Sequence, residues 1–348
     1  MLPRGYLRLR HFDTRGGDRR LQSGGQVNKR RLQIDHIDRI GVNLFTFVLF
    51  FAVNTPDDMA RLAIGGQRVS ADAITKWKVE RGYDKPLFIN TQQSGLSQYT
   101  DTIFYQRSVP LLKFDFGASD EGRDIGREIG KRMWPSLALA IPTFILGLLV
   151  SVAFALLLVF FRTTHLDFWG VVLCVVMLSI SGLFYIIAGQ WLFSKLLRLV
   201  PYSGFAGGWD TLKFLALPVL VAVIARLGPE ARFLRSLFLE EVGKDYVRTA
   251  RAKGLSERVV LFKHVLRNAM LPILTGAVSA LPLLFMGSLI SESFFGIPGL
   301  GSYTIDAISG QDFSVVRAMV FLGSALYILG LILADISYTL ADPRVRFE

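Results

Sequence analysis

The sequence is poor in the residues that most enzymes use for chemistry. It has a single cysteine, Cys174, and only four histidines among 348 residues. One cysteine cannot form an internal disulfide, and the histidines lack metal-ligand spacing. The motifs of serine hydrolases (GxSxG), of zinc peptidases (HExxH) and of complete phosphate-binding loops are also missing. We therefore expect a protein that moves something rather than an enzyme, with no catalytic residue, no bound cofactor and no metal.

Acidic residues are also scarce. The chain has 28 Asp and Glu against 39 Lys and Arg, which gives a formal net charge of +11. In a soluble protein this charge would suggest nucleic-acid binding. However, 51% of the residues are hydrophobic and the mean hydropathy is +0.42, values typical of polytopic membrane proteins. Because the basic residues gather beside the apolar runs, the charge indicates cytoplasmic loops, and we expect no nucleic acid as a partner.

Long apolar runs predict an all-α, polytopic membrane protein with about six transmembrane helices. The predicted parts are a basic cytoplasmic tail at 1–39, a first span at 40–54, an extracytoplasmic (periplasmic) region at 55–132, and a transmembrane core at 133–348. The first span is shorter than the roughly 20 residues that a bilayer needs, so we expect its helix to begin before Ile40. Both termini are expected in the cytoplasm. The predicted later spans are Ser136–Phe161, Trp169–Phe193, Leu212–Leu227, 272–290 and Val315–Ile336.

A polar stretch from Glu240 to Pro272 separates two of these runs. Its first half places apolar residues at helical spacing, and Glu240 can pair with Lys244 one turn away. Gly254 is expected to end this helix, and Ser256 with Glu257 to begin a second one. Apolar Leu261, Phe262 and Val265 are predicted to share one side of the second helix. The stretch therefore predicts a two-helix hairpin that faces the cytoplasm.

The hairpin sequence from Tyr246 to Pro272, YVRTARAKGLSERVVLFKHVLRNAMLP, resembles the EAA loop of ABC importer permeases. It is most similar to the dipeptide and oligopeptide (DppB/OppB) branch. Gly82–Leu87, Phe114–Gly117 and the ending Asp342-Pro343-Arg344 resemble other landmarks of that family. Residues 263–270 and the C-terminal end look most like the Yej-type peptide and microcin C permease.

The resemblance implies the ABC type I importer permease fold and a place in the bacterial inner membrane. It also implies partners: a second permease of the DppC/OppC type, two ATPase subunits that hold ATP and Mg, and a periplasmic solute-binding protein that delivers a peptide. The EAA-type coupling loop would cover 228–270. The residues implied for coupling to the ATPase are Glu241, Asp245, Tyr246, Arg248, Thr249, Ala250, Arg251, Ala252, Lys253, Gly254, Leu255 and Ser256.

Four further residues are candidates for the pathway or a gate: Gln190, Glu292, Pro298 and Gly299. Gln190 lies in an apolar run, where a polar side chain marks either a helix contact or the pathway lining, and packing is the stronger interpretation. Glu292, Pro298 and Gly299 belong to a Gly-rich string whose spacing is not that of a nucleotide site. That string predicts a structural turn with a part in gating.

Other functions stay open at this point. The same fold carries nickel, glutathione or oligosaccharides in relatives. An ion-coupled secondary transporter would need ionisable groups at mid-membrane and an internal repeat. The charged residues, such as Lys213, Arg226 and Asp335, are instead expected at span ends. A scaffold whose basic tail binds nucleic acid or anionic lipid would leave the hairpin unexplained.

Overall fold

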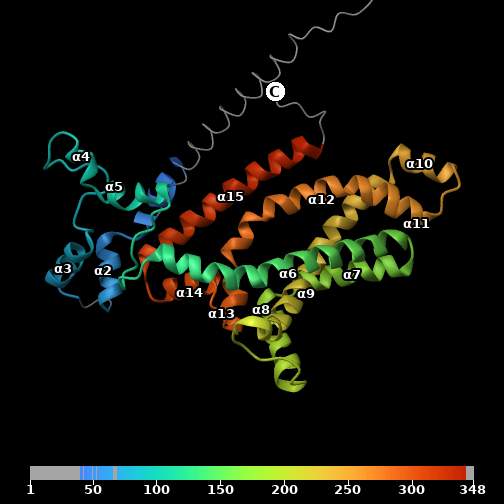
Figure 1. Ribbon diagram of the computed structural model, residues 1–348, viewed down its shortest axis with the longest axis horizontal. Helices are drawn as coiled ribbons and strands as arrows, with labels where there is room; N and C mark the ends of the chain where they lie inside the picture. Colours follow the sequence, from blue (N-terminus) through green and yellow to red (C-terminus); the bar gives the residue numbers. More distant parts are fainter. Residues whose placement is uncertain (1–39, 42, 49, 52, 66–68, 342–348) are drawn as a thin grey trace, which may run out of the picture.

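The computed structural model describes residues 40–341 apart from 42, 49, 52 and 66–68 (Figure 1). The predicted basic tail and the Asp342-Pro343-Arg344 ending lie outside these residues. Within them the fold is helical, and the only β contact is an isolated bridge between Ala118 and Asp124. In chain order the helices are α2 (Pro56–Ile64), α3 (Ala71–Arg81), α4 (Ser97–Thr100), α5 (Ile103–Ser108), η1 (Pro110–Lys113), α6 (Ile125–Phe160), α7 (His165–Ser179), α8 (Gly182–Gly189), η2 (Gln190–Leu196), η3 (Gly208–Asp210), α9 (Thr211–Val242), α10 (Asp245–Ala252), α11 (Glu257–Val259), η4 (Val260–Val265), α12 (Leu266–Ala280), η5 (Pro282–Met286), α13 (Leu289–Phe295), α14 (Leu300–Ser309) and α15 (Phe313–Ala341).

Among the described residues, four helices are long and apolar enough to cross a membrane: α6, α9, α15 and the continuous run Glu257–Met286 that contains α12. The pair formed by α7 and α8 with η2 adds a fifth candidate span. The described residues between 40 and 53, where the first span is predicted, are helical. Figure 1 shows α6 lying beside α7, with the hairpin helices α10 and α11 at one end of this bundle.

The span predicted over Trp169–Phe193 is not one continuous helix. Helix α7 ends at Ser179, and the two halves of the apolar run meet at an angle of 92°. Ile180 and Ser181 both adopt extended backbone conformations, and Gly182 opens the next helix. Kinks concentrate at Gly and Ser because neither residue favours the helix interior. The apolar run therefore makes a broken span, and η2 is a π-helical turn at its far end.

Helix α6 begins earlier than the apolar run from which its span was predicted. Its first residue is Ile125, inside the segment assigned to the extracytoplasmic region, because Asp124 caps the helix by accepting a 2.9 Å hydrogen bond from the Arg127 amide. Glu128, in the first turn, pairs with both Lys131 and Arg132. Helix α6 thus extends beyond the apolar part of the span into the polar region before it.

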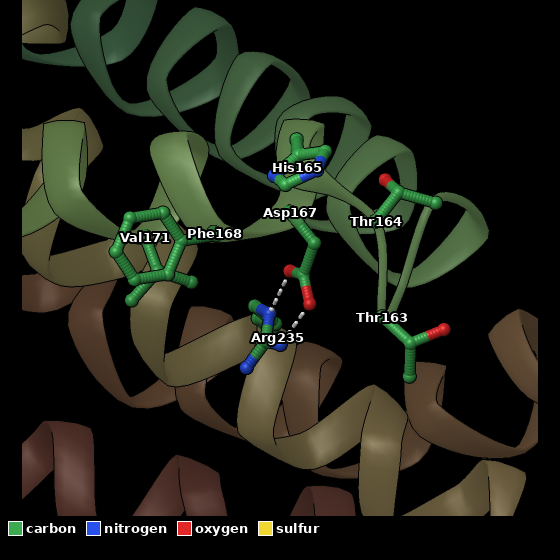
Figure 2. A pocket seen from close by; sticks show the side chains of 7 residues that line it. All are labelled: Thr163, Thr164, His165, Asp167, Phe168, Val171 and Arg235. Carbon is green, nitrogen blue, oxygen red and sulfur yellow. Dashed lines mark hydrogen bonds and ion pairs between the residues drawn. The ribbon is translucent and has the colours of Figure 1, made fainter.

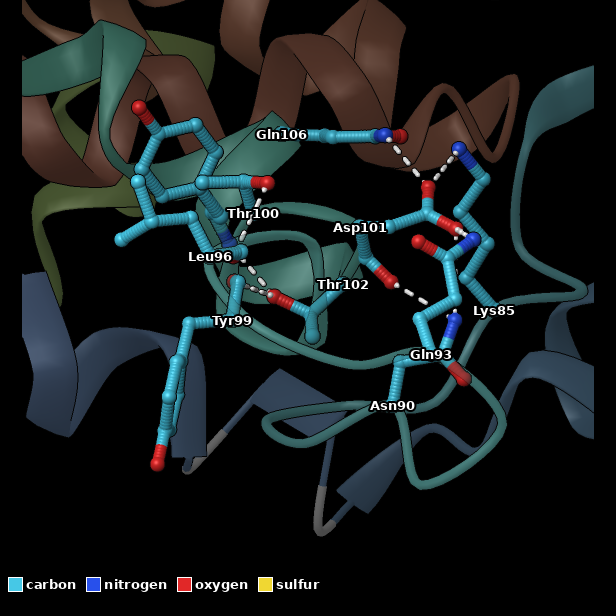
Figure 3. A network of polar contacts seen from close by, with 10 residues as sticks. Lys85, Asn90, Gln93, Leu96, Tyr99, Thr100, Asp101, Thr102 and Gln106 are labelled. Carbon is cyan, nitrogen blue, oxygen red and sulfur yellow. Dashed lines mark hydrogen bonds and ion pairs between the residues drawn. The ribbon is translucent and has the colours of Figure 1, made fainter.

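The segment 55–132 has a small core of its own. Phe47 and Phe51, from the first helical stretch, pack with Met59, Trp77 and Ile103. Outside this core, Asp101 holds a loop together (Figure 3): its carboxylate forms a 2.5 Å ion pair with Lys85 and accepts hydrogen bonds from Asn90, Gln93 and Gln106. This segment is therefore folded against the first helical stretch rather than forming an open loop.

Helices α7 and α9 come very close to one another at Gly228. A Cβ atom added there would lie 2.7 Å from the carbonyl oxygen of Cys174 and 2.8 Å from Cβ of Met177. Only a residue without a side chain fits this approach. Cys174 itself is buried in the contact.

We expect Gly228→Ala to destabilise the protein by about 1–3 kcal/mol, because the added methyl group forces two packed backbones apart. Gly130→Ala is the matched control: it also lies inside a helix, but its Cβ would meet nothing within 4 Å. That change is expected to be neutral or slightly stabilising. Thermal unfolding in detergent measures both variants, and an equal midpoint for the two would contradict the close packing.

Candidate functional site

The sequence predicted one continuous helix for the first half of the hairpin. The structure instead has two helices with a break between them. Helix α9 ends at Val242, and α10 begins at Asp245 after a break at Gly243 and Lys244. Lys244 has an extended backbone and takes the N-cap position of α10. Its ammonium group pairs with Glu241, not with Glu240, and this pairing raises the pKa of Lys244. The hairpin is therefore a separate unit that follows the membrane helix after a sharp break.

The turn between the two hairpin helices matches its prediction at Gly254. This residue has φ of +74°, the left-handed conformation that glycine adopts without strain, and its amide donates to the Arg251 carbonyl at 2.9 Å. Ser256 takes the N-cap position of α11, but its side chain makes no capping hydrogen bond. The predicted capping role of the Ser256 hydroxyl is thus wrong.

The carboxylate of Glu257 joins three parts of the structure. It accepts two hydrogen bonds from Arg251 at the end of α10, at 2.9 and 3.2 Å. It also forms a 2.8 Å ion pair with Arg162, in the turn between α6 and α7. Paired guanidinium–carboxylate contacts fix orientation as well as distance. Glu257 therefore ties both arms of the hairpin to the end of a membrane helix.

Tyr246 fixes α10 to the end of α9. Its hydroxyl donates a 2.6 Å hydrogen bond to Glu241, and the side chain of Asn268 on α12 also bonds this hydroxyl. Burial, together with the bond to Glu241, raises the pKa of Tyr246 to about 12. The hydroxyl consequently stays protonated at physiological pH and remains a donor.

The inner face of the hairpin is apolar and packs on three membrane helices. Val247, Ala250, Leu261 and Val265 are buried in one cluster. The cluster also contains residues of α6, α9 and α12, namely Ala155, Leu156, Val159, Leu234, Phe238, Ala269 and Ile273. Phe262 was predicted to join this face, but its side chain is 60% exposed. The reason is that residues 260–265 form a π-helical turn, which changes the rotation per residue from that of an α-helix.

The residues predicted for coupling fall into two groups. Four point inward and hold the hairpin: Glu241, Tyr246, Ala250 and Arg251. The other eight are exposed and form one outer surface, which we call the ridge: Asp245, Arg248, Thr249, Ala252, Lys253, Gly254, Leu255 and Ser256. The ridge carries three charged side chains and two apolar side chains, Ala252 and Leu255. It can contact another protein without any rearrangement of the residues below it.

Next to the hairpin lies a hollow that the sequence did not reveal. It is lined by Thr163, Thr164, His165, Asp167, Phe168, Val171 and Arg235 (Figure 2). Arg235 of α9 binds Asp167 of α7 through two hydrogen bonds of 2.6 and 2.8 Å. This pair and the Arg162–Glu257 pair both connect the α6–α7 turn to its surroundings. No sequence pattern marks these partners, because they lie far apart in the chain.

Among the predicted pathway or gate residues Glu292, Pro298 and Gly299, Glu292 supplies a buried carboxylate and Gly299 lies directly beside it. Glu292 has no exposed surface. It accepts hydrogen bonds from the amides of Ser288, Gly301 and Ser302, at 3.0, 2.7 and 3.1 Å. Gly299 is buried and precedes α14, while Pro298 is exposed. The carboxylate thus caps the N-terminus of α14, which explains the structural turn, and its part in gating stays a prediction.

Ser136 of α6 completes this arrangement. Its hydroxyl accepts a 2.7 Å hydrogen bond from the Leu300 amide. Gln190 is also buried, and its amide donates to the carbonyls of Tyr202 and Phe294, at 3.2 and 3.1 Å. Its packing interpretation therefore fits the structure. All of these contacts brace α13 and α14 against the broken span and α6.

Residues 132–347 match the family described as the binding-protein-dependent transport system inner membrane component. The match covers more than half of the chain, including the hairpin. The chain belongs to this family. This permease is therefore a multi-pass membrane subunit of an ABC importer with the type I permease fold, and it belongs to a non-catalytic class of subunits.

Relatives of this permease cover almost its full length. One is a "putative peptide transport system permease protein" of Brucella abortus (strain 2308), 32% identical over 313 residues, which are 88% of this chain and 94% of the relative. Another is the glutathione transport system permease protein GsiC of Salmonella paratyphi A (strain ATCC 9150 / SARB42), 32% identical over 86% of this chain and 93% of the relative. These relatives place the permease in the peptide-type DppB/OppB branch. The secondary-transporter and scaffold alternatives are thereby excluded.

The Glu257 contacts predict a local stability difference. We expect Glu257→Gln to weaken the attachment of the hairpin by about 1–2 kcal/mol, because two charge-assisted contacts are lost at a partly exposed site. Trypsin should then cut the hairpin after Arg251 or Lys253 about 5–30 times faster. Glu240→Gln is the control, since Glu240 is exposed and forms no ion pair among the described residues. Equal cleavage rates in both variants would show that Glu257 does not hold the hairpin.

Proposed function

We propose that this permease carries peptides across the bacterial inner membrane, from a periplasmic solute-binding protein toward the cytoplasm. It works with a second permease of the DppC/OppC type and with two ATPase subunits, which bind ATP and Mg. The observation that carries the coupling part of the proposal is the ridge: eight exposed residues held on a hairpin whose inner face packs on α6, α9 and α12. The peptide part is supported by the hairpin sequence and by the names of the relatives.

The ridge transmits force because its support is rigid. Closure of the ATPase subunits pushes on the hairpin, and the hairpin cannot yield separately from the membrane helices. Its apolar face is buried, Glu257 binds it to the α6–α7 turn, and Tyr246 binds it to Glu241. A movement of the ridge is therefore delivered to three spans together.

Gly254 offers a direct test of coupling. We expect Gly254→Val to add about 1–3 kcal/mol of strain or to reorient the second helix, because a β-branched residue resists the left-handed conformation. Insertion should survive, since no atom lies within 4 Å of the added Cβ. In purified complexes in lipid, uptake of peptide and ATP hydrolysis stimulated by loaded binding protein should fall together. Gly254→Asn is the matched control and should keep most of both activities, because Asn tolerates this conformation.

Two results would count against this proposal. Wild-type stimulation in the Gly254→Val complex would show that the hairpin is not the coupling element. An intact wild-type complex that hydrolyses ATP but accumulates no peptide, with any loaded binding protein of the peptide type, would show that the substrate is not a peptide.

Glutathione is the second candidate substrate, because a relative of equal identity is named a glutathione permease. Glutathione is itself a small peptide, so a common pathway can serve both. Competition separates the two substrates: an excess of glutathione should leave the uptake of a labelled oligopeptide unchanged if the peptide assignment is right. Inhibition by glutathione at equal concentration would favour the glutathione assignment.

The proposed orientation places both termini and the hairpin in the cytoplasm and residues 55–132 in the periplasm. We expect an impermeant thiol reagent to label Ser94→Cys, but not Ser256→Cys, in intact cells that carry the background change Cys174→Ala. Ser94 and Ser256 are exposed, whereas the otherwise suitable Ser119 is only 9% exposed. Both thiols should react after the cells are opened. Labelling at position 256 in intact cells would reverse the orientation.

A further inference from the structure

A charged pair lies in the helical bundle between α6 and α9. Arg226 and Glu230, one turn apart on α9, form a 2.7 Å hydrogen bond between Nε and Oε1. The other oxygen, Oε2, accepts a 3.1 Å hydrogen bond from the Ser151 hydroxyl of α6. Arg226 was expected near the end of the apolar run Leu212–Leu227, and α9 continues beyond that run as far as Val242.

Two neighbouring helices fix the depth of this pair. Ser151 lies about 14 Å from the end of α6 at Phe160, taking 1.5 Å per residue. On the opposite side, Gly228 packs against Cys174 of α7, which lies about 14 Å from the start of α7 at His165. Both distances are measured from the same α6–α7 turn. With that turn at the edge of the hydrocarbon layer, which is about 30 Å thick, the pair lies about halfway across the layer.

The pair forms one wall of a cavity of about 200 Å³ between α6, α9 and α12. Small residues, Gly147, Gly276 and Ala277, leave the space open, and Phe144 and Phe233 contribute aromatic surface. The cavity is large enough to hold several water molecules. Ionisable side chains at this depth usually face a wet pathway and serve transport.

Within this cavity the guanidinium group of Arg226 has hydrogen-bond donors that Glu230 does not use. A guanidinium group carries five N–H donors, and the contacts with Glu230 use only Nε and one Nη2 hydrogen. The Arg226 side chain is 55% exposed, against 29% for Glu230. Glu230 is thus satisfied by Arg226 and Ser151, while Arg226 can still accept an anion. A carboxylate is the peptide group that fits such a planar, bidentate donor.

We propose that this cavity is a substrate-binding point in the translocation pathway, at which Arg226 binds the C-terminal carboxylate of a passing peptide. Glu230 positions the guanidinium and does not touch the substrate. This inference rests on the proposed peptide transport and adds a selectivity step inside the membrane, beyond selection by the binding protein. The aromatic and small residues around the pair leave room for the side chains of the peptide and do not select among them.

The test compares two peptides, trialanine with a free C-terminal carboxylate and trialanine amide, in the complete complex reconstituted in liposomes with one binding protein. The ratio of their uptake rates is the measured quantity, so that the preference of the binding protein cancels between variants. We expect Arg226→Gln to lower the acid-to-amide ratio about tenfold and Arg226→Lys to preserve most of it. Arg232→Gln is the matched control, because Arg232 is exposed on the same helix and does not line the cavity. Its ratio should equal that of the wild type.

The outcomes separate this inference from the proposed function. Peptide uptake with an unchanged ratio in Arg226→Gln would overturn the inference and leave peptide transport standing. No uptake of either peptide by the wild-type complex would overturn the proposed function, and this inference with it.

A second measurement decides the case in which Arg226→Gln prevents assembly with the second permease. Ala277→Cys, in a Cys174→Ala background that retains Arg226, places a thiol in the cavity wall. Trialanine should slow modification of this thiol by a thiol reagent during turnover, and trialanine amide should slow it less. Equal modification rates with and without trialanine would mean that Arg226 serves the contact between the two permeases instead.

Discussion

The hairpin depends on one carboxylate. Glu257 is bound by Arg251 from the hairpin and by Arg162 from the α6–α7 turn, and neither contact can change without the other. Apolar packing alone holds a helix pair against a membrane bundle but is non-directional. The hydrogen bonds and ion pair of the two guanidinium groups fix the orientation of the hairpin on the bundle. Together they make the hairpin a continuation of the bundle rather than an appendage.

The carboxylate of Glu292, between α13 and α14, is stabilised in a different way from that of Glu257. Glu292 is completely buried without a cationic partner among its hydrogen bonds, and backbone amides of Ser288, Gly301 and Ser302 satisfy it. Two of these amides belong to the first turn of α14, where the helix dipole favours a negative charge. Glycines at 287 and 299 leave room for this carboxylate, since a Cβ atom at either would overlap its oxygens, and Gly301 leaves room for the backbone at Ser288. The Gly-rich string is thus explained by space around a carboxylate rather than by a nucleotide.

Sequence patterns predicted the parts of this structure that depend on local chemistry. The spans of α6, α9 and α15 follow from hydropathy, and the turn at Gly254 follows from the conformational freedom of glycine. Contacts between distant residues could not be predicted. Arg162 and Glu257 carry no shared pattern, and neither do Ser151 and Glu230, which lie on different helices. The break at Ser181 was hidden by apolar residues on both sides.

Helix α9 runs without interruption for 32 residues, which is about 48 Å at 1.5 Å per residue. One end adjoins the hairpin through Glu241, the middle carries Arg226 and Glu230, and the other end begins at Thr211, directly after η3. Such a helix behaves as a lever. A tilt of about 5° at the hairpin end would displace the far end by about 4 Å over this length. A small movement at the hairpin end would thereby become a larger one at Thr211, with the charged pair near the middle of the helix.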